Sequence, residues 1–192
     1  MFTRRAFLVA VPASGLAACA AKGPAPSFPP FHVGDGPLRL NVARIAVEDR
    51  SSLLGAGHIE GEFDVSPLTA LNNWIGDRLD AAGSSGILTV TVRDASAIEE
   101  RLETTGGVSG LFKDEPGAKV TARLRVDFTA DDPDRLVTAR SSVAVERFTT
   151  VPKDVDFTER RQLLYSLSKG LIEDFDRKAM VSIPQYFGAF LG

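Results

Sequence analysis

The sequence predicts an α+β fold: a two-layer sandwich in which two helices cover one face of a four-stranded, mainly antiparallel sheet. Apolar residues recur at helical spacing after Ser66 and again after Asp156, which is typical of amphipathic helices. Elsewhere apolar and polar residues alternate, as in strands that bury one face. Two layers bury the helix stripes and the inward strand faces together. We therefore expect the order β-α-β-β-β-α in a single domain, residues 38–192.

The first strand is expected over residues 38–47. Its apolar residues change phase near Ala43–Arg44, which predicts a bulge there or burial on both faces. The first helix follows, with Ser66 as its N-cap and Pro67 as its first residue. Gly83 is expected to end it. The apolar stripe of this helix comprises Leu68, Leu71, Ile75, Leu79 and Ala82.

Three more strands are expected, over residues 87–98, 119–129 and 137–145. The middle one alternates most regularly, with Val126 and Phe128 among its inward residues and Arg125 and Asp127 pointing outward. An acidic turn, residues 131–134, separates the last two strands. This pattern predicts two antiparallel hairpins.

The second helix is long and is expected to begin at Asp156, which has the spacing of a capping box with Glu159. Pro184 should kink or end it. Its stripe comprises Leu164, Leu167, Leu171 and Phe175. The apolar tail that follows is expected to fold back onto the domain and comprises Tyr186, Phe187, Phe190 and Leu191.

The N-terminal segment has the pattern of an export signal. Arg4 and Arg5 precede a short apolar run that ends in Leu16-Ala17-Ala18-Cys19, and the run is too short to span a bilayer as a stable helix. The ending resembles the bacterial lipobox, in which the cysteine sulfur carries a diacylglycerol and the preceding peptide is removed. The resemblance implies that residues 1–18 are a cleaved lipoprotein signal peptide and that acyl chains are attached to Cys19.

Alternatives to this interpretation are an ordinary cleaved signal peptide or a chance cysteine. Cys19 is the only cysteine of the chain, so it has no intramolecular disulfide to form. Residues 3–8, TRRAFL, also resemble a twin-arginine export signal, and plain Sec export is the alternative. Ala20 follows the cysteine in place of Asp, which by the enterobacterial sorting rule favours the outer membrane over the inner one.

Residues 19–37 are rich in Pro and Gly and read as a lipidated tether. Phe28, Phe31 and Val33 predict that its end packs partly onto the domain. The formal net charge of the whole chain is −3, and cleavage after Ala18 would remove two arginines and no acidic residue. This balance argues against nucleic acid as a partner.

The order of elements behind a lipobox and a Pro-rich tether resembles small bacterial envelope lipoproteins. The families are the LPS-assembly lipoprotein LptE and the auxiliary lipoproteins of intermembrane lipid-transport ABC systems. The resemblance covers residues 38 to about 183 at the level of topology, with Trp74 in the first helix and the apolar pattern of the last. It implies a domain tethered to the outer membrane that serves a larger assembly, and it carries no set of functional residues.

Residues with catalytic chemistry are few. The two histidines, His32 and His58, are expected to be solvated loop residues, and no His/Cys cluster has zinc spacing. Ser109 lacks the context of a nucleophile elbow. The aspartates of residues 131–134 are interrupted by Pro133 and read as a turn and not as a calcium loop. We therefore expect no enzyme, no metal and no cofactor beyond the acyl chains on Cys19.

One loop stands out, between the second and third predicted strands. Residues 100–119 are rich in glycine and carry Val108, Leu111 and Phe112. Exposed apolar residues on a loop mark a contact site for a partner protein or a membrane surface. The alternative is that Leu111 and Phe112 fold back over the sheet edge as a small satellite core.

Three functions follow from these observations. The leading one is a non-catalytic accessory lipoprotein, anchored in the cell envelope and facing the periplasm, that binds an outer-membrane barrel or a transport complex in LPS assembly or lipid transport. The second is a carrier of lipid or small apolar ligands, with a pocket between helices and sheet lined by residues such as Trp74, Leu79, Phe128 and Phe175. The third is an envelope hydrolase, with Asp94 or Glu99 as its carboxylate.

Overall fold

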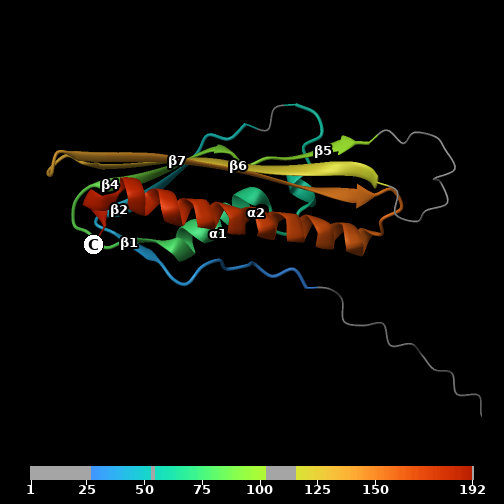
Figure 1. Ribbon diagram of the computed structural model, residues 1–192, viewed down its shortest axis with the longest axis horizontal. Coiled ribbons are helices and arrows are strands. Elements are labelled where there is room, and N and C mark those ends of the chain that lie inside the picture. Colours follow the sequence, from blue (N-terminus) through green and yellow to red (C-terminus); the bar gives the residue numbers. More distant parts are fainter. Residues whose placement is uncertain (1–26, 53–54, 103–115, 192) are drawn as a thin grey trace, which may run out of the picture.

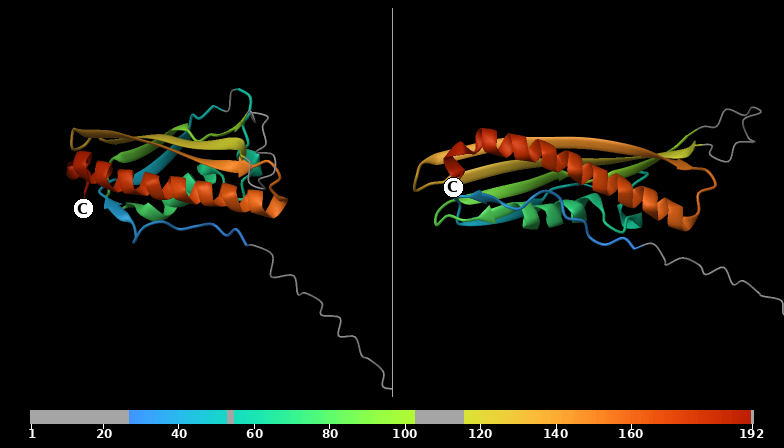
Figure 2. Two further views of the ribbon diagram at one scale, coloured as in Figure 1. Left: turned by 45° about the vertical axis from the view of Figure 1, so that its right-hand side comes forward. Right: turned by 60° about the horizontal axis from the view of Figure 1, so that its bottom comes forward.

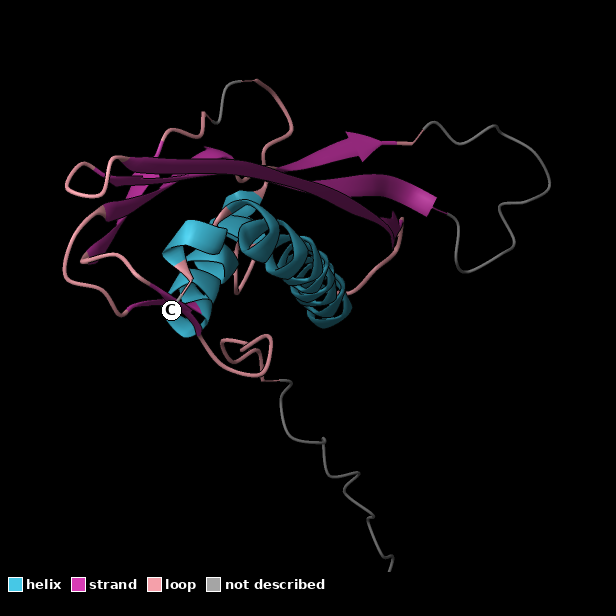
Figure 3. Ribbon diagram, turned by 60° about the vertical axis from the view of Figure 1, so that its left-hand side comes forward, coloured by secondary structure: helices cyan, strands magenta, loops and turns pink. Residues whose placement is uncertain are grey.

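The computed structural model describes residues 27–52, 55–102 and 116–191. In these ranges the chain forms two layers: a sheet, and two helices that both lie on one face of it (Figure 3). The predicted α+β class and the placement of the helices are therefore confirmed. No helix in the described ranges is both long and apolar enough to cross a membrane.

The main sheet has five strands: β2 (Arg44–Asp49), β4 (Ile87–Asp94), β5 (Ala97–Arg101), β6 (Pro116–Asp132) and β7 (Val137–Pro152). β6 is its centre (Figure 1). β7 pairs antiparallel with β6 along almost the full length of β6, and so occupies one edge of it. β4 and β5 pair antiparallel with successive parts of β6 and share its other edge. β2 adds to β4 in parallel.

The expectation of a four-stranded sheet is therefore wrong in strand number. The strand expected over residues 87–98 is interrupted between β4 and β5. Asp94 Oδ1 accepts a hydrogen bond from the backbone N–H of Ser96 at 3.0 Å, a local turn that takes the place of strand pairing. The two halves nevertheless run along the same edge of β6, so both predicted hairpins are present.

The first expected strand is also divided. Its start, β1 (Leu38–Leu40), pairs in parallel with β3 (Leu79–Ala81) in a separate two-stranded sheet. Its end is β2, which begins at Arg44. The change of apolar phase near Ala43–Arg44 therefore marks the passage of the chain from one sheet to the other and not a bulge within one strand.

Helix α1 (Pro67–Arg78) begins where the sequence predicts, because Ser66 Oγ accepts a hydrogen bond from the backbone N–H of Thr69 at 3.2 Å. It ends a turn earlier than expected, at Arg78. Leu79 keeps a buried side chain but adopts an extended backbone and starts β3. Gly83 lies where the chain returns past Asn41, and a Cβ there would be 2.4 Å from Asn41 Oδ1.

Helix α2 (Phe157–Tyr186) is capped by Asp156, whose Oδ1 accepts from the backbone N–H of Glu159 at 2.8 Å. Pro184 lies in its last turn, and the helix ends two residues later, at Tyr186. Phe187 and Phe190 are fully buried, and the carbonyl of Phe190 accepts a hydrogen bond from the backbone N–H of Asn41 at 2.6 Å. The predicted folding back of the C-terminal tail is therefore confirmed.

The long axis of α2 runs beside β7 in every view (Figures 1 and 2). The N-terminal part of α2 lies at the end of the sheet where β5 ends and β6 begins. Its C-terminal part lies at the opposite end, near the turn between β6 and β7, where Arg135 donates to the carbonyl of Ala189. The molecule therefore has two distinct ends, each bordered by one end of α2.

Candidate functional site

The predicted site residues with the strongest sequence signals, Cys19, Val108, Leu111 and Phe112, lie outside the described residues. The described chain begins at residue 27, eight residues after the cysteine. The structure therefore bears on how the chain next to the expected anchor meets the domain, and on which surfaces the domain offers.

The end of the expected tether packs onto α2. The rings of Phe28 and Phe31 each lie 5.3 Å from the ring of Tyr165, centroid to centroid. The hydroxyl of Tyr165 donates a hydrogen bond to the carbonyl of Pro29 at 2.9 Å. Arg161 lies over the Phe28 ring, 4.6 Å from its centroid. The predicted docking of this segment is therefore confirmed.

A second contact joins the expected tether to both helices. Arg78 of α1 donates to the carbonyl of Gly36 and, at 2.8 Å, to Asp176 of α2. Trp74 Nε1 donates to the same Asp176 oxygen at 2.8 Å. Gly34 has φ of +84°, and a Cβ at this position would lie 2.4 Å from the Arg78 guanidinium. Glycine is thus required where the segment passes Arg78.

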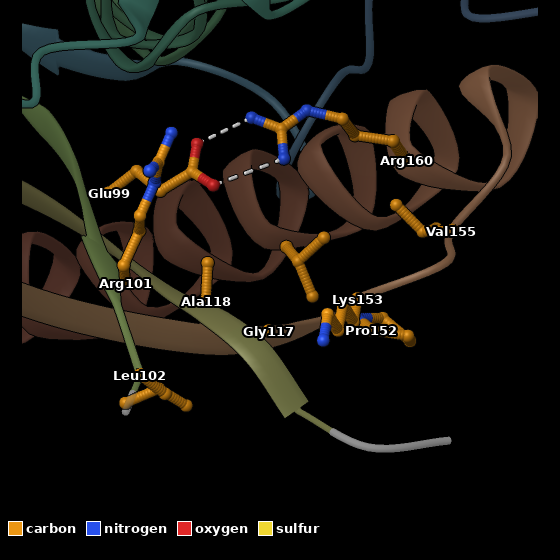
Figure 4. A pocket seen from close by; sticks show the side chains of 10 residues that line it. Glu99, Arg101, Leu102, Gly117, Ala118, Pro152, Lys153, Val155 and Arg160 are labelled. Atoms are coloured by element: carbon orange, nitrogen blue, oxygen red, sulfur yellow. Dashed lines mark hydrogen bonds and ion pairs between the residues drawn. The ribbon is translucent and has the colours of Figure 1, made fainter. Parts of the chain in front are cut away.

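A pocket of about 400 Å³ opens at the end of the sandwich where α2 begins (Figure 4). It lies between β5, the start of β6, the end of β7 and the first turn of α2. Its walls combine apolar and charged side chains. The lining residues are Glu99, Arg101, Leu102, Gly117, Ala118, Val151, Pro152, Lys153, Val155 and Arg160.

Arg160 and Glu99 form the central ion pair of this pocket (Figure 4). Arg160 Nη2 lies 2.6 Å from Glu99 Oε2 and 2.7 Å from Glu62 Oε2. The hydrogen bond to Glu99 raises the pKa of Arg160, although burial of the guanidinium opposes the rise. Both carboxylate oxygens of Glu99 accept from Arg160, so the pair links β5 to α2.

The other two cations of the pocket, Arg101 and Lys153, have no hydrogen-bond or ion-pair partner within the described ranges. Guanidinium and ammonium groups bind carboxylates and phosphates. The described lining contains no Ser, Thr, Cys or His side chain, so it offers none of these nucleophiles.

Asp94, the other carboxylate considered for hydrolysis, does not line the same pocket as Glu99. It lines a separate hollow over the strands, with Arg123, Arg125 and Glu146 among its neighbours. Its Oδ1 accepts the hydrogen bond from Ser96 that ends β4. The two candidate residues therefore do not form a carboxylate pair.

The two histidines each lie at hydrogen-bond distance from a different carboxylate. His32 Nδ1 lies 2.6 Å from Asp77 Oδ2 at the surface, and His58 Nδ1 lies 2.8 Å from Glu60 Oε1. Burial of Glu60 acts to raise its pKa, but hydrogen bonds from His58 and from the backbone N–H of Ala97 outweigh it, and the pKa is lowered. No group of three metal-binding side chains occurs in the part of the chain that the structure describes.

The residues expected to line a carrier pocket form the centre of the core instead. Trp74, Leu79, Phe128 and Phe175 are all buried. The Trp74 ring packs edge-on against Phe175 at 5.0 Å and lies 6.3 Å from Phe128. These side chains fill the space between helices and sheet, and the described pockets are lined by other residues.

The sequence pattern does not single out the charged residues that organise these contacts, Arg160, Arg78 and Asp176. The four-residue spacing of Trp74 and Arg78 along α1 placed them on one helix face and could have drawn attention to Arg78. Nothing in the sequence pairs Arg160 with Glu99, which is 61 positions away.

Comparisons with known proteins give weak structural likeness only. No family model matches the chain, and no curated protein matches it by sequence. Three solved structures are among those that resemble it. A minor lipoprotein from Acinetobacter baumannii has 15% identity and a TM-score of 0.35, covering 75% of this chain and 95% of its own. A DUF330 protein from Xanthomonas campestris has 11% identity and a TM-score of 0.28, covering 73% and 89%.

The third is the PelC dodecamer from Paraburkholderia phytofirmans, with 16% identity and a TM-score of 0.21, covering 74% of this chain and 92% of its own. All three TM-scores lie below 0.5, so these likenesses carry no argument about function.

Proposed function

We propose that this chain is a non-catalytic accessory lipoprotein of the bacterial cell envelope. Acyl chains on Cys19 anchor it to a membrane, and we favour the outer membrane over the inner one. The domain faces the periplasm. There it binds a partner protein, either an outer-membrane barrel or a transport complex in LPS assembly or lipid transport.

The observation that supports this proposal most is that the segment after the expected anchor packs onto the domain. Ser27, where the described chain begins, lies only eight positions after Cys19, a span of about 28 Å at full extension. Just after Ser27, Phe28 and Phe31 pack on Tyr165 and the segment is fixed to α2. A lipid on Cys19 would therefore hold the start of α2 close to the bilayer, as suits a domain that works at a membrane.

The chemistry of the described surface supports a binding role over catalysis. The candidate carboxylates Asp94 and Glu99 are apart, and Glu99 is occupied by Arg160. The aromatic core that the carrier alternative requires to be open is filled by Trp74, Phe128 and Phe175 packing on one another. The carrier function therefore stays the second candidate, because the pockets described above are not lined by these aromatic core residues.

The test uses the full chain with an affinity tag in its native host. Intact cells are crosslinked, membranes are fractionated and the crosslinked proteins are identified by mass spectrometry, for the wild type and for Cys19→Ala. Ala20→Ser serves as the matched control, because it alters the next residue and keeps the cysteine. The proposal expects membrane retention and an envelope partner for the wild type and the control, and loss of both for Cys19→Ala. Lipid without any protein partner would favour the carrier instead.

A further inference from the structure

A groove runs between the outer edge of β7 and the C-terminal half of α2, and it is distinct from the pocket of Figure 4. Figure 2 shows α2 beside β7 along this edge. The groove holds about 550 Å³ and continues past Arg177 and Lys178 into a smaller hollow beside Val145 and Glu146. We call it the β7–α2 groove; it is lined by Arg140, Ser141, Ser142, Arg177, Lys178, Val181, Ser182, Gln185 and Tyr186.

The strand side of the groove is an open sheet edge. β7 pairs with β6 on one side, and no strand pairs with its other side in the described ranges. One hydrogen bond shows which main-chain groups face outward: Lys178 Nζ donates to the carbonyl of Ala144 at 2.9 Å. In an antiparallel strand both main-chain groups of a residue face the same edge, and alternate residues face the same way. Arg140 and Ser142 therefore direct their N–H and C=O groups to this free edge.

The helix side of the groove offers exposed apolar surface. Val181 is 67% exposed and Tyr186 is 57% exposed, although both belong to a helix whose opposite face is fully buried. An unpaired strand edge beside exposed apolar side chains is the arrangement by which sheets accept an additional strand.

The charge of the groove is positive in a chain whose net charge is negative. It contains Arg140, Arg177 and Lys178, and the nearby Asp174 is already paired with Arg147 and Arg177. Arg140 has no ion-pair partner in the described part of the chain. A second copy of this chain on the same edge would bring these cations against their own counterparts, and like charges across an interface oppose binding.

We propose that the β7–α2 groove binds an extended, acidic segment of the partner protein, which adds as a strand to the free edge of β7. This inference rests on the proposed accessory function and assigns the surface and the chemistry of the partner. The segment's main-chain groups pair with Arg140 and Ser142, and its carboxylates meet the Arg140 and Lys178 side chains. In the unbound protein, the Lys178 ammonium protects the edge by occupying the Ala144 carbonyl.

The test places a photo-crosslinking amino acid at Gln185, an exposed groove residue, in the full chain expressed in its native host. The control position is Val47, which is 47% exposed on β2, the opposite edge strand. Crosslinked peptides are sequenced by mass spectrometry. Each position is also combined with Arg140→Glu and, as the matched charge reversal, with Arg44→Glu on β2. Both arginines are exposed and lack a described ion-pair partner.

The expected result is an adduct at Gln185 with a segment of an envelope protein that has net negative charge. Arg140→Glu should reduce this adduct about ten-fold or more, whereas Arg44→Glu should leave it within about two-fold, with urea unfolding midpoints of both variants near the wild type.

Three results would overturn the proposal. These are a partner crosslinked at Val47 only, a segment at Gln185 that is basic or insensitive to Arg140→Glu, and an adduct between two copies of this chain. The first two results would still support binding of a partner protein, and they would contradict only the assignment of the binding surface to the β7–α2 groove. If no position yields a partner, the proposed accessory function fails as well.

Discussion

Asp176 and Arg78 form an ion pair between the two helices, with Arg78 Nε 2.8 Å from Asp176 Oδ1 and side chains that are only 13% and 11% exposed. The same carboxylate oxygen accepts the indole N–H of Trp74. Asp176 therefore satisfies two donors of α1 at once, and the Arg78 guanidinium also holds the carbonyl of Gly36. Through this pair the two helices and the segment before β1 become one unit.

Asp176→Ala should lower the free energy of unfolding by about 3 kcal/mol, because it leaves a largely buried guanidinium without its counter-charge. Asp176→Asn should cost less, because its amide oxygen still accepts a hydrogen bond. Asp80→Ala is the control: Asp80 lies 3.8 Å from Arg39 in an exposed pair, and its loss should cost less than about 1 kcal/mol. Urea unfolding of the three variants measures this, and equal losses at Asp176 and Asp80 would contradict the account.

The glycines within α1 and α2, Gly76 and Gly170, should respond differently to replacement by alanine. Gly76→Ala in α1 should stabilise the protein by about 1 kcal/mol, since alanine is the better helix former and nothing lies within 4 Å of the added Cβ. Gly170→Ala in α2 should give none of this gain, because its Cβ would lie 2.6 Å from Arg147 Nε. Arg147 must then move away from Asp174, to which it donates at 2.8 Å.

Thermal or urea unfolding of the two glycine variants gives the comparison directly. Adding Arg147→Ala to Gly170→Ala should recover part of the gain, since the obstacle is removed. If Gly170→Ala alone stabilises as much as Gly76→Ala, the Arg147 side chain does not lie close to Gly170.

Ser168→Ala should leave the stability unchanged or raise it by about 1 kcal/mol. The Ser168 hydroxyl is buried in α2 and has no hydrogen-bond partner in the described structure, so its removal relieves an unsatisfied polar group. Ser182→Ala, on the same helix, is the control, because Ser182 shares a hydrogen bond with Ser141. That variant should lose about 1 kcal/mol. A loss at Ser168 equal to the loss at Ser182, in urea unfolding, would mean that the Ser168 hydroxyl is satisfied.

Glu60 should contribute stability that the protein loses in acid. Its pKa is lowered below the ordinary value of 4.5, because hydrogen bonds from His58 and Ala97 outweigh the opposing effect of burial. A carboxyl group with a depressed pKa stabilises the fold above its unfolded pKa, and this contribution is lost as pH falls through the folded pKa. The free energy of unfolding should therefore fall below pH 4.5.

Glu60→Gln should reduce the acid dependence of stability, measured by urea unfolding across a pH series. Glu100→Gln is the matched control, because Glu100 is exposed on the neighbouring β5 and has no hydrogen-bond or ion-pair partner within the described ranges. It should retain the wild-type slope. A Glu60→Gln slope equal to that of the wild type would show that hydrogen bonds from His58 and Ala97 do not lower the pKa of Glu60 in the folded protein.

The elements that local chemistry determines could be predicted from the sequence. Ser66 and Asp156 both cap the helices that they were expected to begin, because a capping side chain acts on N–H groups only two or three residues away. The alternation in β6 likewise reports a sheet with one buried face.

Elements that depend on distant partners could not be predicted. Leu79 fits the apolar stripe of α1, yet it starts β3 because Leu38 lies beside it to pair with. The interruption between Asp94 and Ala97 keeps the apolar pattern of one strand, so the pattern does not reveal it. Arg160 is one of many charged residues in the sequence, and only the fold places it against Glu99 and Glu62.

If the domain is held at a membrane through Cys19, the N-terminal peptide of the mature protein must carry the lipid. The full chain is extracted from membranes of its native host, digested, and its N-terminal peptide is identified by mass spectrometry. The expected result is a peptide that begins at Cys19 and carries a diacylglycerol on its sulfur. A mature chain that begins elsewhere, or a Cys19 without lipid, would contradict it.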